Sequence, residues 1–91
     1  MAEWIAGFLQ YLQVECGYSP HTLDAYARDL ARFEEHARGE LTADTVRSFA
    51  TRLSARGLAP SSVARHVASL RSFLKFLVNE GRVRQDLRRY L

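Results

Sequence analysis

The stretch SSVARHVASLRSFLKFLV, residues 61–78, decides the fold because one edge of it has the pattern of a long helix's buried stripe. Its apolar residues are spaced by four, three, four and three positions, which places them on one face of an α-helix. The opposite edge is unusual for a solvated face, since it carries short side chains around one long cation, Arg65. The apolar edge is Val63, Val67, Leu70, Leu74 and Leu77, and the short residues are Ser61, Ser62, Ala68, Ser69 and Ser72.

Outward from this stretch, the same helical period covers nearly the whole chain without strand alternation. Serine, threonine or proline stands at each later start, and glycine follows each end. We therefore predict an all-α four-helix bundle of two crossed helical hairpins. The helices are expected from Ala2 to Cys16, from Pro20 to near Gly39, from just after Thr42 to Gly57, and from Pro60 to near Gly81.

The other helices have core stripes of their own. Cys16 is placed on the apolar face of the first helix, and Phe76 is placed on the outward side of the fourth. The stripes of the first three helices are Ile5, Phe8, Leu9, Leu12 and Cys16; Leu23, Tyr26, Ala27, Leu30, Phe33 and Ala37; and Val46, Phe49, Ala50 and Leu53.

Composition restricts the class of protein. Ninety-one residues suffice for one modest core, and no apolar run reaches the roughly 20 residues of a membrane span. The single Cys16 cannot form an internal disulfide, so we expect a cytoplasmic protein. No Cys/His cluster has metal-ligand spacing, and no nucleophile stands with a histidine and an acid. We therefore expect no cofactor and no catalytic site in this chain.

Charge is distributed unevenly along the sequence. Residues 1–45 hold eight acids and three bases, whereas residues 46–91 hold two acids and ten bases. Six cations and no acid lie between Asp44 and Glu80. A GC-rich genome would favour arginine over lysine, but it would not remove the acids. The distribution therefore indicates a basic surface that meets a polyanion.

The predicted second and fourth helices begin with similar residues, which could bind an anion. Residues 17–33 align with residues 57–73 at an offset of 40, and hydroxyls stand in both first turns. Free N–H groups and the helix dipole favour phosphate there, although such hydroxyls more often act as simple caps. The residues that point away from the core are Thr22, Ala25, Arg28, Asp29 and Arg32 on the second helix, and Ser61, Ser62, Arg65, Ser69 and Ser72 on the fourth.

Residues 17–33, GYSPHTLDAYARDLARF, resemble the pattern S-x-x-T-x-x-x-Y-x-x-D-L-x-x-F. This pattern opens the N-terminal core-binding domain of tyrosine recombinases, the phage-integrase family, in its Xer-like branch. Residues 56–77 resemble the last long helix of the same domain, in the right order and at the right separation. The resemblance, over residues ~4–82, implies a SAM-like bundle that clamps a recombination half-site. Its second and fourth helices would enter the major groove of the DNA.

Carried over position by position, the resemblance implies a set of DNA-binding residues and a domain plan. Residues 1–82 would form the core-binding domain, and residues 83–91 would begin a basic linker to a catalytic domain that this chain lacks. Tyr90 would lie in that linker and would not be the nucleophile, and the proline usual after the fourth helix is missing. The implied contacts are His21, Thr22, Arg28, Ser61, Ser62, Arg65, His66 and Ser69, of which His66 rests mainly on the resemblance.

The implied partners are double-stranded DNA, other recombinase subunits and the absent catalytic domain, with no membrane and a monomeric isolated domain. We expect the outward Phe76 to pack against that catalytic domain, a neighbouring subunit or the tail. Two other classes of protein fit the same residues. A helical protein–protein module could pair its acidic half with a basic half of another copy. A freestanding helix-turn-helix regulator would need a dimerisation surface, for which only Phe76 and Tyr90 are candidates.

Overall fold

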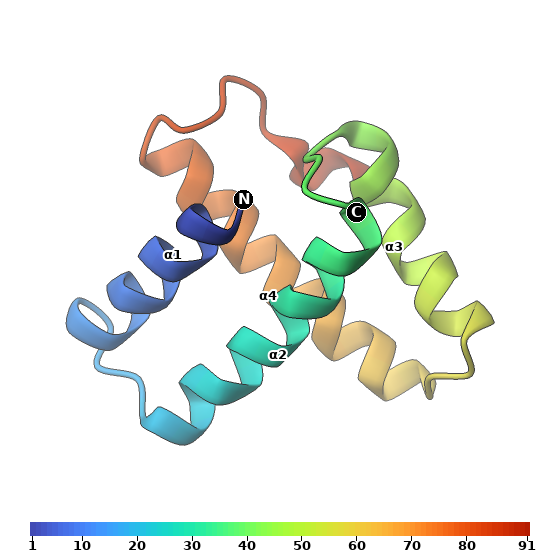
Figure 1. The fold of residues 1–91 in the computed structure, drawn as a ribbon, viewed down its shortest axis with the longest axis horizontal. Coiled ribbons are helices and arrows are strands. Elements are labelled where there is room, and N and C mark those ends of the chain that lie inside the picture. Colours follow the sequence, from blue (N-terminus) through green and yellow to red (C-terminus); the bar gives the residue numbers. More distant parts are fainter.

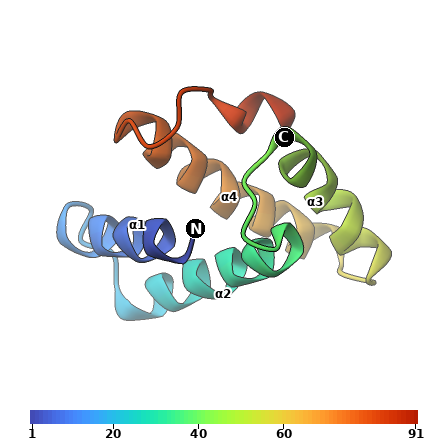
Figure 2. The ribbon, with the colours of Figure 1, turned by 45° about the horizontal axis from the view of Figure 1, so that its top comes forward.

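The computed structural model describes residues 1–91 and confirms the all-α prediction of four helices. Helices α2 and α4 cross near the centre, with α1 beside them on one side and α3 on the other (Figure 1). A turned view separates α2 from α4 as two layers (Figure 2). The elements are α1 (Ala2–Val14), α2 (Pro20–Ala37), α3 (Ala43–Ala55), α4 (Pro60–Asn79) and a short 3-10 helix, η1 (Leu87–Tyr90).

Local capping chemistry sets where the helices begin. Ser19 caps α2 by accepting a hydrogen bond from the Thr22 N–H at 3.3 Å. Thr42 caps α3 in a reciprocal capping box with Thr45. The N-cap of α4 is Ala59, which offers no side-chain hydrogen bond. The two proline-started helices are therefore capped differently, despite the matching sequence around them.

The core is centred on one phenylalanine from each helix. Phe8, Phe33, Phe49 and Phe73 are each at most 1% exposed. Phe33 and Phe49 meet edge to face at 5.2 Å between ring centroids, and the Phe8 and Phe73 centroids lie 5.6 Å apart. Aromatic pairs in such geometry contribute beyond their buried area. Because each pair joins two helices, the four rings hold the helical layers together.

Two placements on the first and fourth helices differ from expectation. Helix α1 ends at Val14, so Cys16 lies outside it and is exposed. The chain turns away there through Gly17, whose φ of 66° favours glycine. Phe76 packs against α1 rather than against the tail, with its ring centroid 5.3 Å from Phe8 and 5.2 Å from Tyr11. Helix α1 packs across α4 and covers the face that carries Phe76, a face that the periodicity of α4 alone predicts to be exposed.

The residues after Gly81 pack back onto α3 and α4. Leu87 is 7% exposed and joins the core. Asp86 caps η1 through the Arg88 N–H, and hydrogen bonds from Arg88 lower the pKa of Asp86 to about 2. The Arg47 guanidinium lies 5.1 Å from the centre of the Tyr90 ring. That residues 83–91 begin a linker stays a prediction, but here they are part of the packed domain.

None of the helices combines the length and apolarity that crossing a bilayer requires.

We predict that Leu87→Ala lowers the free energy of unfolding by about 2 kcal/mol, because it removes buried methyl groups at the edge of the core. Urea unfolding followed by circular dichroism measures the change. Arg84→Ala, in the exposed part of the same tail, is the control and should change stability by less than about 0.5 kcal/mol. Equal stability of the two variants would show that the tail does not pack against the core in solution.

Candidate nucleic-acid interface

The crossing of α2 and α4 is built around Asp29, whose side chain is 2% exposed. Ser69 Oγ donates to Asp29 Oδ2 at 2.8 Å. Arg65 donates to the same carboxylate twice, from Nη2 to Oδ1 at 3.0 Å and from Nε to Oδ2 at 3.3 Å. Because a carboxylate is stable in a protein interior only when paired and hydrogen-bonded, these donors account for its burial.

His66 completes the cluster from the buried side. Its Nδ1 lies 2.6 Å from the Ser62 carbonyl oxygen, which can only accept, so Nδ1 carries the hydrogen. Its Nε2 faces Asp29 Oδ1 at 3.4 Å, and the ring is 3% exposed. His66 therefore fills and orients the crossing.

The expected outward placement of Asp29 and Ser69 is wrong, and His66 also lies inward. All three are buried where α2 and α4 cross, so faces that a single helix would expose are covered by the other helix. With 3% and 6% of their surfaces exposed, His66 and Ser69 offer almost nothing to an external ligand. Their position makes them supports for Arg65 rather than contacts.

The other predicted contacts lie on or near the surface. His21, Arg28, Ser61 and Arg65 are exposed. Thr22 is half-buried, and its hydroxyl accepts from Ser19 Oγ at 3.1 Å in the cap. Ser62 is half-buried too, and its carbonyl accepts from His66. The N-terminal halves of α2 and α4 approach the crossing from the same lower edge of Figure 1.

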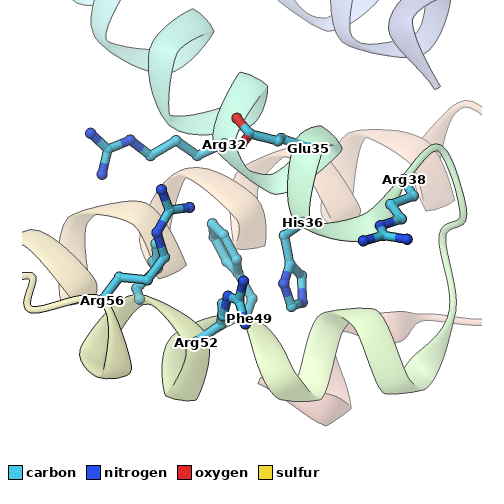
Figure 3. Close-up of a pocket in the computed structure, with 8 residues that line it drawn as sticks. Arg32, Glu35, His36, Arg38, Phe49, Arg52 and Arg56 are labelled. Atoms are coloured by element: carbon cyan, nitrogen blue, oxygen red, sulfur yellow. The ribbon is translucent and has the colours of Figure 1, made fainter.

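A second basic feature, a cleft between α2 and α3, was not predicted from the sequence. Its volume is about 420 Å³, and its polar lining is dominated by arginine (Figure 3). The acid-free run of cations after Asp44 indicated a basic surface, but tertiary packing decides which of these cations lie beside α2. The cleft is lined by Arg32, Glu35, His36, Arg38, Phe49, Arg52, Leu53 and Arg56.

The chain has no group of three or more His, Cys, Asp or Glu side chains placed to hold a metal ion.

Fold and surface together define an all-helical domain of the SAM-like type with exposed arginines on α2, α3 and α4. The family model described as "Phage integrase, N-terminal SAM-like domain" matches residues 5–81, and the chain belongs to that family. No solved structure gave a significant match.

Similar full-length proteins are tyrosine recombinases by name. The chain is 40% identical over 85 residues to tyrosine recombinase XerD of Bradyrhizobium diazoefficiens, covering 87% of this chain and 26% of that protein. It is 40% identical over 86 residues to tyrosine recombinase XerC of Azotobacter vinelandii, covering 87% of this chain and 29% of that protein. The chain thus spans less than a third of the curated relatives it matches.

We predict that Asp29→Ala lowers the free energy of unfolding by about 2–4 kcal/mol, because it leaves the buried Ser69 hydroxyl without its acceptor and removes the carboxylate that Arg65 pairs with. Asp24→Ala is the matched control, since Asp24 is an exposed acid of the same helix. It should change stability by less than about 0.5 kcal/mol. Denaturant unfolding of both variants provides the measurement, and a negligible loss for Asp29→Ala would contradict the role given to the cluster.

Proposed function

We propose that this chain is the DNA-binding module of a site-specific tyrosine recombinase, and that it clamps a recombination half-site with α2 and α4 in the major groove. The observation that carries the proposal is the exposed Arg65 guanidinium held at the α2–α4 crossing within a family match over residues 5–81. Its contacts would be His21, Thr22, Arg28, Ser61, Ser62 and Arg65. His66 and Ser69 would act through Arg65 and Asp29.

The ion pair leaves Arg65 able to bind a second acceptor. Its side chain is 60% exposed, whereas Asp29 is 2% exposed, so one side of the guanidinium is buried and the other faces solvent. Of its five N–H donors, two are used by Asp29. The rest are free for a phosphate oxygen or a base edge. Because Asp29 already fixes the side chain, binding would cost little further rotamer entropy.

The short side chains of α4 would let the duplex come close to Arg65. Ser61, Ala64 and Ala68 are exposed neighbours of Arg65 on this helix. A major groove about 12 Å wide admits one helix, and long side chains along its face would hold it away from the base edges. The small residues therefore favour an approach in which Arg65 is the longest side chain of its patch.

The intact protein is proposed to be a cytoplasmic tyrosine recombinase whose catalytic domain lies outside this chain. The relatives above carry that enzyme name, and this chain matches about a quarter to three tenths of their lengths. The module would act beside other recombinase subunits on the same DNA. The isolated domain is expected to be monomeric and not itself an enzyme.

Titration of the ¹⁵N-labelled domain with duplex DNA at low salt tests the proposal. Amide signals of the N-terminal halves of α2 and α4 should shift, and the shifts should reverse as salt is raised. If no signal on either helix moves, the DNA-binding proposal fails.

We predict that Arg28→Gln weakens duplex binding about fivefold to tenfold, because it removes one cation from the proposed surface without touching the Asp29 cluster. Fluorescence anisotropy measures the affinity. Arg84→Gln is the control, since it removes the same charge from the tail. Arg65→Ala should weaken binding as well but should also lower stability, because it leaves Asp29 short of donors. Equal affinities of Arg28→Gln and Arg84→Gln would contradict the contact assigned to Arg28.

The alternative function, a helical protein–protein module, is favoured by one observation. Tyr11, Val14 and Tyr18 are 41%, 67% and 38% exposed beside an aromatic groove between α1 and α4. Light scattering separates the two functions. Oligomers that grow with protein concentration and ignore DNA would favour this alternative.

A further inference from the structure

The arginine cleft between α2 and α3 holds cationic charge that the protein itself does not neutralise. Its lining has four arginines against one glutamate, a formal charge of +3. None of these four arginines makes an ion pair or a side-chain hydrogen bond within the chain. By contrast, Arg47, Arg65 and Arg88 each pair with an aspartate. An unneutralised concave cluster of guanidinium groups has the chemistry of an anion site.

We propose that this cleft binds a phosphate group, and that the group is a backbone phosphate of the DNA that α2 and α4 engage. The source of the phosphate rests on the proposed function, whereas the chemistry of the cleft stands on its own geometry. Guanidinium forks match phosphate oxygens bidentately, which makes arginine well suited to this ligand. Helix α3 thereby becomes part of the DNA-binding surface.

The placement of the arginines fits one phosphate held from two walls. Arg32 comes from α2, and Arg52 and Arg56 come from the end of α3. Figure 3 shows Arg32 and Arg56 at the same end of the cleft, with Arg38 at the other. Arg52 and Arg56 are one helical turn apart, a spacing at which like charges repel. A bound dianion or phosphodiester would relieve that repulsion.

His36 keeps the two walls together. Its Nε2 lies 3.1 Å from the Thr45 carbonyl oxygen and 3.0 Å from Ser48 Oγ, both on α3. Its ring also packs against Phe49, with the centroids 5.5 Å apart. These contacts join the last turns of α2 to the start of α3. These His36 contacts therefore fix the distance between α2 and α3, and with it the separation of the arginines across the cleft.

The cleft is continuous with the proposed groove-binding surface. Arg28 and Arg32 are one turn apart on α2 and share a face. Arg56 is the C-cap residue of α3 and precedes Ala59, the N-cap residue of α4, by three positions. A DNA strand that borders the groove occupied by α2 and α4 would thus pass the end of the cleft that holds Arg32 and Arg56.

Paired charge removals test the proposal. In one variant Arg52→Gln and Arg56→Gln are combined, and in the control Arg82→Gln and Arg84→Gln are combined. All four side chains are exposed, and each variant loses two positive charges. The control residues follow the C-terminal end of α4 at Asn79, which lies about 21 Å along the helix from Arg65 at 1.5 Å per residue. Circular dichroism should show the same fold and melting behaviour for both variants.

Duplex affinity is then measured by fluorescence anisotropy over a series of salt concentrations. The cleft variant should bind at least tenfold more weakly than the unmodified domain, and its plot of log affinity against log salt should be shallower by about one unit. The control variant should lose less than threefold and keep its slope. Equal losses in the two variants, with DNA binding intact, would overturn the cleft proposal and leave the proposed function standing.

A titration with inorganic pyrophosphate tests the phosphate site without DNA. The guanidinium Nε–H signals of Arg52 and Arg56 should shift on titration, while those of Arg82 and Arg84 should not. If the unmodified domain fails to bind any duplex, the proposed function fails, and selective shifts at Arg52 and Arg56 would still support a phosphate site. Absent shifts, or equal shifts at all four arginines, would overturn the phosphate site itself.

Discussion

The carboxylate of Asp29 is the group on which the arrangement of α2 and α4 depends. It comes from α2, and its three side-chain partners, Arg65, His66 and Ser69, all come from α4. A buried charge without donors costs several kcal/mol, so only a narrow range of positions of α2 on α4 keeps it satisfied. Apolar contacts such as those of Leu30 and Leu70 tolerate small sliding, whereas hydrogen bonds to one carboxylate do not. The ion-pair cluster therefore fixes the register in which the two helices cross.

The value of this cluster lies in geometry more than in net stability. Buried ion pairs can often be replaced by apolar groups of similar volume without loss of stability, because desolvation offsets much of the attraction. An apolar replacement of Asp29 would not orient the Arg65 guanidinium, which is hydrogen-bonded to Asp29 on its buried side and faces solvent on the other. The same contacts thus set both the helix crossing and the direction of the exposed cation. In the proposed DNA interface, stability and binding would consequently be coupled at Arg65 and separable at Arg28.

The features that follow from local chemistry could be predicted from the sequence, and those that require two elements to meet could not. The helix starts at Ser19 and Thr42, the glycine stops and the phenylalanine core follow from capping and periodicity. Asp29 was misplaced because a helical wheel sees one helix, and the helix that covers it lies 36 residues further along the chain. Phe76 was misjudged for the same reason, because α1 covers it. The Asp29–Leu30 pair belongs to the pattern that residues 17–33 resemble, and this was the local signal that position 29 differs from an ordinary surface acid.

The two basic features differ in how their charge is balanced, and this difference bears on what each can contribute to binding. Arg65 is paired with the Asp29 carboxylate, so the pair carries little net charge but holds the guanidinium in a fixed orientation. The four cleft arginines make no ion pair, and with Glu35 the lining keeps a formal charge of +3, so ions from solution must balance this charge until a ligand replaces those ions. Affinity gained through counterion release grows with the number of neutralised phosphates and falls with salt. If both proposed contacts are made, the cleft would contribute most to the salt dependence of DNA binding, and Arg65 would set the orientation of the domain on the duplex.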